Sequence, residues 1–464
     1  MDAAYSFAKH LVNTKYEDIP GPAIEAAKKE ILDLLGVAMG GSSKQGVKEL
    51  LELIAEWGGK EEGTVLCFGN RVPAPNAAQV NATMGHALDY DDTGDGPVHC
   101  SVVIVPTCLA AAERKGKVSG KEFVSAVALG VDIHCRLGAG FRGGVRGPTP
   151  GGHPGAGWHL TPVYGFIAAA GVSGRIFGLD ENKMINALGI AYHQCAGNGQ
   201  AVVDGALTKR MGPGFAARGG MVAALMAEKG ITGAPNCLEG ECGLFTLYHQ
   251  GKYDSNALTA DLGKVYKGTN VEMKPYPCCK GTHGYVEATM SLVKKHNIVP
   301  GDVGEIMITC PGQGALSIPL EVKAHPRNLV DSQFSIPWAV AVVIARKRAG
   351  IADFTEEAIA SRDILDVADK IKLDASGEGG PGAMTKSGVR ITMRNGQTYS
   401  ASAFGQAPGG PQEPLPFSVY ENKFRDCVSY SVKKLSDKTV DTVIQLVKDL
   451  ERVDDVREII RLLS

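Results

Sequence analysis

The stretch Val389-Arg-Ile-Thr-Met-Arg-Asn-Gly-Gln-Thr-Tyr-Ser400 differs in pattern from the helical sequence that surrounds it. Its apolar and polar residues alternate on both sides of Asn395-Gly396, which is the period of a half-buried strand. Because Asn-Gly readily adopts the positive φ angles of a type I′ turn, the stretch predicts a β-hairpin. A second β-rich run lies at Glu305-Ile-Met-Ile-Thr-Cys310. Together they predict a smaller α+β domain over residues 266–404.

Apolar residues at helical spacing dominate the remainder of the chain. Before residue 266 they predict helices over 20–57, 76–90, 103–115, 120–137, 161–172, 181–196 and 214–228. Ser119 with Glu122 three residues on, and Asp180 before the next run, are helix start signals.

The end of the chain returns to the same helical pattern. The amphipathic run from Ser436 to Leu463 follows a Pro/Gly-rich stretch over 405–416. We therefore expect a mainly α protein with an α+β second domain. Residues 1–265 and 405–464 would form one large all-helical domain, and residues 266–404 a smaller lid domain inserted between them.

Composition limits the classes of function. A chain of 464 residues exceeds what one hydrophobic core usually supports. The net charge of −2 gives no field that favours nucleic acid or an acidic membrane surface. The apolar runs are shorter than the roughly 20 residues of a membrane span, and the eleven cysteines show no framework spacing. We expect a cytoplasmic protein with reduced thiols and a small-molecule partner, without nucleic acid or membrane.

The run His86-Ala-Leu-Asp-Tyr-Asp-Asp-Thr93, with His99 six residues later, is dense in chemically active groups. It places three carboxylates, a hydroxyl and two imidazoles beside the apolar stretch Val102 to Pro106. Such groups are costly to bury unless each finds a partner, so they indicate a pocket. We expect catalysis here.

Further segments could carry chemistry. The glycine-rich loop over 138–159 ends in Trp158-His159, and such loops often border active sites. Lys209 and Arg210 precede the predicted helix at 214, which suits a carboxylate or phosphate, although a solvated basic turn is the alternative.

Two later segments combine polar groups with a fixed backbone. In Lys274-Pro-Tyr-Pro-Cys-Cys-Lys-Gly-Thr-His283 the prolines restrict the backbone, so Lys274 can be aimed at small entropic cost. His283 then opens a predicted helix over 284–295. In Asp331-Ser-Gln-Phe-Ser335 the polar groups are explained mainly as a helix cap.

Two short patterns resemble cofactor-binding motifs, one for a dinucleotide and one for zinc, but neither has the required context. Gly138-Ala-Gly140-Phe-Arg-Gly143 matches the dinucleotide fingerprint only formally, because the preceding segment is helical and no acidic residue follows about 20 positions later. The adjacent pair Cys278-Cys279 lacks the Cys-x-x-Cys spacing of a zinc site. We expect neither a metal nor a nucleotide cofactor.

In order and spacing these segments resemble the MmgE/PrpD family, which contains 2-methylcitrate dehydratases, cis-aconitate decarboxylases and an iminodisuccinate epimerase. The matching segments are the run from His86 with His99, Gly157-Trp-His159, Thr208-Lys209 with Gly214-Phe-Ala-Ala, Lys274-Pro-Tyr-Pro with His283, Phe334-Ser-Ile-Pro, and Lys423-Phe424.

The resemblance implies a cofactor-independent homodimer with its active site between the helical domain and the α+β lid. It also implies the site positions, which are Asp89, Thr93, His99, His159, Lys209 and Lys274, with His283 near the same cleft.

Substrates of the family are small di- or tricarboxylates, and its reactions move a proton at carbon next to a carboxylate. We therefore expect Lys209 and Lys274 to hold substrate carboxylates and His99 or His159 to transfer the proton. Asp89 and Thr93 would orient the imidazole or bind a substrate hydroxyl. Asp91 and Asp92 would cap or brace the turn.

Several reactions fit this residue set. A lyase is expected first, either a dehydratase of the 2-methylcitrate type or a decarboxylase of the cis-aconitate type. An epimerase of an iminodisuccinate-like dicarboxylate is the alternative, and a silent carboxylate-binding protein is a further one from another class. Many relatives carry a histidine soon after the threonine and a proline after the second histidine, where this chain has Gly94-Asp95 and Cys100. The resemblance therefore does not name the substrate.

Overall fold

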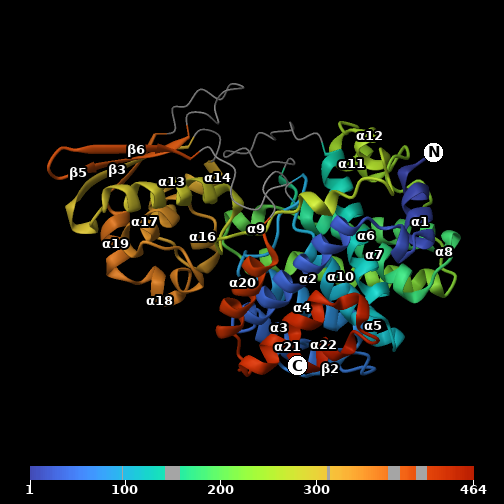
Figure 1. The fold of residues 1–464 in the computed structure, drawn as a ribbon. Coiled ribbons are helices and arrows are strands. Elements are labelled where there is room, and N and C mark those ends of the chain that lie inside the picture. Colours follow the sequence, from blue (N-terminus) through green and yellow to red (C-terminus); the bar gives the residue numbers. More distant parts are fainter. Residues whose placement is uncertain (97, 142–156, 311–313, 375–386, 404–414) are drawn as a thin grey trace.

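Figure 1 shows the chain, a computed structural model, as two lobes, one mostly of helices and one with a sheet. The structure describes all residues except 97, 142–156, 311–313, 375–386 and 404–414. The predicted fold class is confirmed, because helices from both ends of the chain share one apolar cluster, and a mixed sheet with its helices forms a second. The predicted domain limits at 265/266 and 404/405 stay predictions, and most of the stretch 405–416 lies outside the described residues.

The helical lobe contains the first twelve helices and the last three. The first twelve are α1 (Ala3–Asn13), α2 (Gly21–Gly41), α3 (Val47–Trp57), α4 (Ala74–His86), α5 (Ser101–Lys115), α6 (Gly120–Gly140), α7 (Leu160–Phe177), α8 (Glu181–Tyr192), α9 (Gln200–Val203), α10 (Thr208–Glu228), α11 (Leu244–His249) and α12 (Ser255–Thr259). The last three are α20 (Phe417–Ser429), α21 (Asp437–Lys448) and α22 (Arg457–Leu463). A short antiparallel pair, β1 (Gly63–Thr64) and β2 (Arg71–Val72), completes this lobe.

The C-terminal return is fixed by close packing of α20 on α2. A Cβ added at Gly36 would lie 2.9 Å from Cα of Phe424, and one added at Gly40 would lie 2.9 Å from the carbonyl oxygen of Cys427. Real Cβ atoms do not approach other atoms so closely. Glycine at these two positions therefore allows the last part of the chain to reach the first.

The second lobe is built around a four-stranded sheet of order β4-β3-β5-β6, in which only β3 and β4 are parallel. Its strands are β3 (Val303–Thr309), β4 (Ile371–Asp374), β5 (Gly388–Met393) and β6 (Thr398–Ser402). Its helices are α13 (Lys280–His296), α14 (Gly314–Ser317), α15 (Leu320–Ala324), α16 (Leu329–Gln333), α17 (Ile336–Arg346), α18 (Glu356–Ile359) and α19 (Arg362–Ala368).

The predicted hairpin is present, but its predicted turn type is wrong. β5 and β6 pair antiparallel, and within the loop Gly396 has a φ of 87° whereas Asn395 is not among the residues with positive φ. The amide of Gly396 donates to the carbonyl of Met393 at 2.9 Å. This is a type I turn followed by a left-handed glycine, because a longer loop lets glycine alone carry the positive φ.

Helix boundaries follow the capping signals in the sequence, but several other boundaries differ from the prediction. The predicted helix over 20–57 is divided, because α2 ends at Gly41 and α3 begins at Val47, and the C-terminal run is divided between α21 and α22. The Ser119 and Asp180 side chains accept from the amides of Glu122 and Lys183, as their cap positions predict. In contrast, α10 begins at Thr208 and α13 at Lys280, so Lys209 and His283 lie within first turns instead of before or at the helix start. Lys209 is thereby held on a rigid element.

Two buried helices meet the length and composition of a membrane span. In α6 and α7, 94% and 89% of the apolar window is buried inside the protein. Core helices of globular proteins meet the same criteria.

The turn that follows α4 lies between the two lobes. Leu88 and Tyr90 join Val37, Cys427 and Ile351 in a small apolar cluster, in which Ile351 comes from the second lobe. This turn carries the run predicted to be catalytic.

Candidate active site

Asp89 occupies the turn after α4 in an unusual backbone conformation. Its φ is 49°, in the left-handed region that aspartate tolerates better than most residues. Its carboxylate accepts from the ammonium of Lys209 through Oδ1, and from that of Lys274 through Oδ2 at 2.7 Å. Lys274 also donates to the carbonyl oxygen of Asp89 at 2.9 Å. One buried carboxylate therefore joins two lysines that are 65 positions apart in sequence.

The charges of this triad stabilise one another. Burial alone would raise the pKa of Asp89, but Lys209 and Lys274 outweigh it and hold the pKa well below its ordinary value. Burial alone would lower the pKa of Lys274, but Asp89 and then Asp91 raise it above its ordinary value. Carboxylate and ammonium both stay charged near neutral pH.

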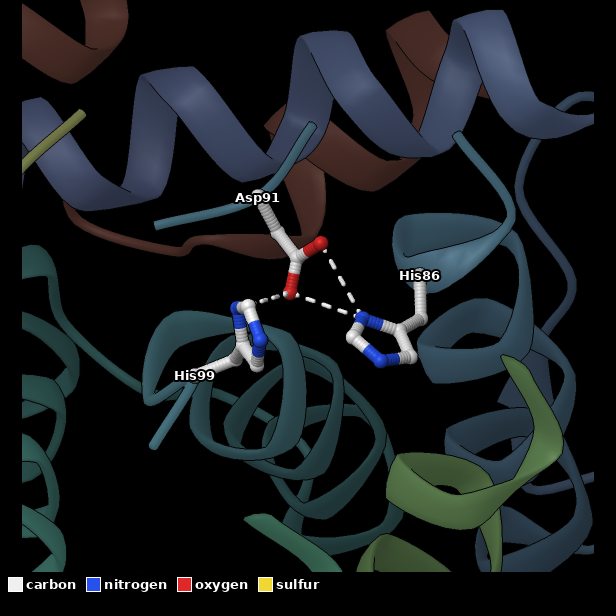
Figure 2. A group of neighbouring side chains, drawn as sticks. All are labelled: His86, Asp91 and His99. Carbon is white, nitrogen blue, oxygen red and sulfur yellow. Dashed lines mark hydrogen bonds and ion pairs between the residues drawn. The ribbon is translucent and has the colours of Figure 1, made fainter. Parts of the chain in front are cut away.

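The carboxylate of Asp91 lies against the rings of His86 and His99, as Figure 2 shows. Its oxygens lie 2.9 and 3.0 Å from Nδ1 of His86, and Oδ2 lies 3.4 Å from Nδ1 of His99. Burial, with a further contribution from nearby lysines, lowers the pKa of both histidines well below 6.5, so the contacts are those of neutral rings. The carboxylate that contacts the imidazoles is therefore that of Asp91, whereas that of Asp89 contacts the lysines, and the bond from His86 to Asp91 also spans the turn between them.

Hydrogen bonds fix the tautomers of these two rings. Nδ1 of His99 lies 2.6 Å from the carbonyl oxygen of Asp92, and a carbonyl only accepts, so Nδ1 carries the proton. Nε2 of His99 then presents a lone pair and has no partner among the described residues. In His86, the ammonium of Lys209 donates to Nε2 at 2.8 Å and Nδ1–H donates to Asp91. His86 is therefore saturated, whereas His99 can accept a proton.

His159 immediately precedes α7, and its ring stacks on that of His86 at 5.9 Å between centroids and 18° between planes. Room for the ring comes from Gly212 of α10, where an added Cβ would lie 3.2 Å from Nδ1 of His159. The ring makes no hydrogen bond within the described part of the chain. Burial and then Lys209 lower its pKa well below 6.5. The remainder of the predicted loop, 142–156, lies outside the described residues.

Thr93 and His283 lie at the margin of this group. Thr93 pairs through its backbone with Glu272, and its buried Oγ1 has no hydrogen-bond partner among the described residues. Nε2 of His283 lies 3.1 Å from the carbonyl oxygen of Cys278, and burial together with Lys274 lowers the pKa of His283 to about 3. The structure thus brings Asp89, Lys209 and Lys274 into contact, whereas neither Thr93 nor His283 forms a hydrogen bond or ion pair with any of the three.

Asp92 behaves as predicted for a cap. Its carboxylate accepts from the amides of Cys100 and Ser101 at 3.0 and 2.9 Å, at the start of α5. These two bonds fix the segment from which His99 projects.

Comparison with known proteins identifies the chain. The MmgE/PrpD N-terminal domain matches residues 5–256, and the MmgE/PrpD C-terminal domain matches residues 276–459. The chain belongs to the MmgE/PrpD family. It is similar to the cis-aconitate decarboxylase of Aspergillus terreus, with 26% identity over 97% of this chain and 94% of the relative. It is also similar to the cis-aconitate decarboxylase of Homo sapiens, with 26% identity over 99% of this chain and 94% of the relative.

In this MmgE/PrpD protein, some residues of the site were quoted from the sequence without the contacts that they make. His86 opens the run predicted to be catalytic but was assigned no role, and Asp91 was expected only to cap or brace the turn. Phe334, from the second lobe, places its ring 4.6 Å from the ammonium of Lys209. The pattern of His86 five residues before Asp91 was a usable signal, whereas nothing local in the sequence connects Phe334 to Lys209.

His86, Asp91 and His99 offer ligand atoms within 4.8 Å of one another, a spacing that a metal ion could use. However, a cation bound by both Nδ1 atoms would break the 2.6 Å bond from His99 to Asp92. It would also face the ammonium of Lys209 across the ring of His86. The residues present fit a hydrogen-bonded network better than a metal centre.

Proposed function

We propose that this MmgE/PrpD enzyme is a lyase that removes a carboxylate from a small tricarboxylate of the cis-aconitate type. One observation carries the proposal: Lys209 and Lys274 converge on Asp89, and each keeps an N–H for a ligand. An ammonium has three N–H donors. Lys209 uses two, on Asp89 and His86, and Lys274 uses two, both on Asp89, within the described part of the chain. The unused pair suits a ligand with carboxylates.

The relatives support decarboxylation over dehydration. The cis-aconitate decarboxylases of Aspergillus terreus and Homo sapiens are each matched over nearly their whole length. At 26% identity the substrate itself remains part of the proposal.

The side chains can supply each step of such a reaction. When a carboxylate leaves as carbon dioxide, the electron pair of the broken bond stays on carbon. This negative charge is delocalised into a neighbouring carboxylate of the substrate. Lysines that hold the other carboxylates stabilise this enolate-like charge, and a proton from His99 or His159 then neutralises the carbon. Both rings are neutral in the free protein, but the negative charge of a bound tricarboxylate raises their pKa. Substrate binding thereby favours the protonated donor.

The reaction can be tested with cis-aconitate, 2-methylcitrate and a panel of dicarboxylates in heavy water. We expect carbon dioxide from cis-aconitate and one deuterium in the product at each turnover, unchanged after dialysis against a metal chelator. Alkene formation or loss without carbon dioxide would replace decarboxylation by dehydration. Exchange with stereochemical scrambling would indicate an epimerase, and tight binding without turnover a silent binding protein.

A further inference from the structure

Lys423 of α20 is a buried lysine behind the site. Its side chain is 4% exposed, and α20 brings it there through the close contact with α2. Its ammonium donates to the carbonyl oxygens of Tyr90 at 2.8 Å and Lys274 at 3.0 Å, and lies 2.8 Å from Oδ1 of Asp33. Its hydrogen bonds therefore go to main-chain oxygens, with Asp33 as its ion-pair partner, and not to a side chain that was predicted for the site.

The two carbonyls belong to different site segments. Tyr90 lies between Asp89 and Asp91, and Lys274 is itself the lysine that binds Asp89. The two segments are also joined by the reciprocal backbone bonds of Thr93 and Glu272, each 2.9 Å. The hydrogen bonds of Lys423 link the same two segments a second time, next to the pair formed by Asp89 and Lys274. Lys423 itself comes from a third part of the chain.

We propose that Lys423 is a positioning residue, which fixes the main chain at Tyr90 and Lys274 so that Asp89 and Lys274 meet in the geometry required for turnover. It contacts none of the imidazoles and neither carboxylate oxygen of Asp89 within the described residues. Its effect therefore passes through the backbone. A displacement of about 1 Å in a catalytic group can reduce activity on the order of a hundredfold.

Lys423→Met tests the proposal against a matched control, Lys28→Met. Lys28 is also buried, at 4% exposure, and its ammonium also meets three oxygens, from Glu25, Lys448 and Glu451, but away from the site. We expect Lys423→Met to lower kcat/KM for cis-aconitate about ten- to a hundredfold at temperatures where it is folded. Lys28→Met should lower the melting temperature without that loss.

Removing Lys423 alone leaves Asp33 buried without its cation, which can prevent folding. The double variant Lys423→Met with Asp33→Asn removes both charges and carries the same expectation. A folded variant of either kind with wild-type kcat/KM would overturn the proposal.

Hydrogen exchange gives a second readout that does not depend on the reaction. The expected loss of kcat/KM rests on the proposed function. Exchange at the amides of Thr93 and Glu272 instead reports directly how firmly the two segments are held together. We expect these two amides to exchange faster in the Lys423 variants and at the wild-type rate in Lys28→Met. If the wild type turns over none of the acids, the proposed function fails, and unchanged exchange at both amides would still overturn the role of Lys423.

Discussion

At the residue scale, the three histidines of the site differ in whether a ring nitrogen lacks a hydrogen-bond partner. Both nitrogens of His86 are bonded, to Asp91 and Lys209, whereas Nε2 of His99 and the ring of His159 have no partner among the described residues. Proton transfer needs an available nitrogen, so we assign it to His99 or His159 and a supporting role to His86.

His99→Ala and His159→Ala are expected to lower kcat by a factor of about 10² to 10⁴, the usual contribution of general acid–base catalysis. Circular dichroism and melting temperature should stay close to those of the wild type. His193→Ala, at an exposed position, is the control and should leave the rate unchanged. Near-normal rates in both site variants would contradict the assignment.

The pKa of Asp92 leads to a prediction of how the free energy of unfolding changes with pH. Burial, with a contribution from the neighbouring Asp91, raises the pKa of Asp92 to about 7. The unfolded chain loses this proton near pH 4 and the folded chain keeps it to about pH 7. The contribution of Asp92 to stability is therefore present below pH 4 and is lost as the pH rises toward 7.

Asp92→Asn removes that titration. We expect the free energy of unfolding of the wild type to fall relative to the variant by about 1.4 kcal/mol per pH unit across this interval, as the limiting slope for one proton. Urea unfolding at a series of pH values measures the difference. A difference that does not change with pH would contradict the raised pKa.

The sequence predicted which residues gather in the site better than it predicted their partners. The resemblance to the MmgE/PrpD family placed Asp89, Lys209 and Lys274 in one site, and the structure brings them into contact. The exchange of roles between Asp89 and Asp91 depends on the φ of 49° at Asp89, which turns its carboxylate toward the lysines. A residue type alone does not specify that angle, because aspartate also adopts the ordinary regions.

At the scale of elements, the contact between α2 and α20 decides where the C-terminal return lies. Gly36→Ala would place a Cβ 2.9 Å from the main chain of Phe424, so the two helices would have to separate. We expect a loss of about 1–3 kcal/mol in the free energy of unfolding, which is the usual cost of overpacking.

Gly21→Ala is the matched control on the same helix, since a Cβ there would meet nothing within 4 Å. Chemical denaturation of both variants measures the difference. Equal stabilities would show that the close approach of α20 does not depend on Gly36.

Element prediction succeeded where a local cause exists. Caps at Ser119 and Asp180 and the strand pattern around Gly396 follow from short-range rules, and all three elements are present. The start of α10 was placed at 214 instead of 208, because Pro213 and the glycines beside it discourage helix locally. Packing of α10 on α4 and α7 overrides that preference.

At the scale of the whole molecule, the site joins contributions from both lobes. Lys209 comes from α10 of the helical lobe, and Phe334 against it comes from the second. Gln333 of the second lobe also donates to the carbonyl of Ala87 at 3.1 Å. A ligand held at Lys209 and Lys274 should therefore stabilise the two lobes together.

We expect cis-aconitate to raise the melting temperature in a single transition, with about 2.7 kcal/mol of stabilisation at a concentration 100 times Kd. Lys209→Met should lose this rise, and the exposed Lys434→Met should keep it. Calorimetry measures both. A ligand that stabilises only one of two separate transitions would contradict a shared site.

The homodimer stays a prediction from the resemblance. Light scattering on the purified chain should give twice the monomer mass of 48.8 kDa. A mass that stays at the monomer value across the micromolar range would contradict it.

The inserted second lobe was predictable because strand and helix periods differ over many residues. The position of Lys423 was not, because its partners Tyr90 and Lys274 lie 333 and 149 positions away along the chain. Long-range contacts of this kind depend on how whole helices pack, and no local pattern specifies them.

Asp89 supplies two lysines with a single internal counter-ion. Two ammonium groups that face one carboxylate keep one positive charge in excess. A ligand carboxylate can therefore bind at the unused N–H groups without displacing Asp89. A monocarboxylate balances the excess charge through one lysine, whereas a molecule with several carboxylates can also reach the other, so we expect affinity to rise with the number of carboxylates on the ligand.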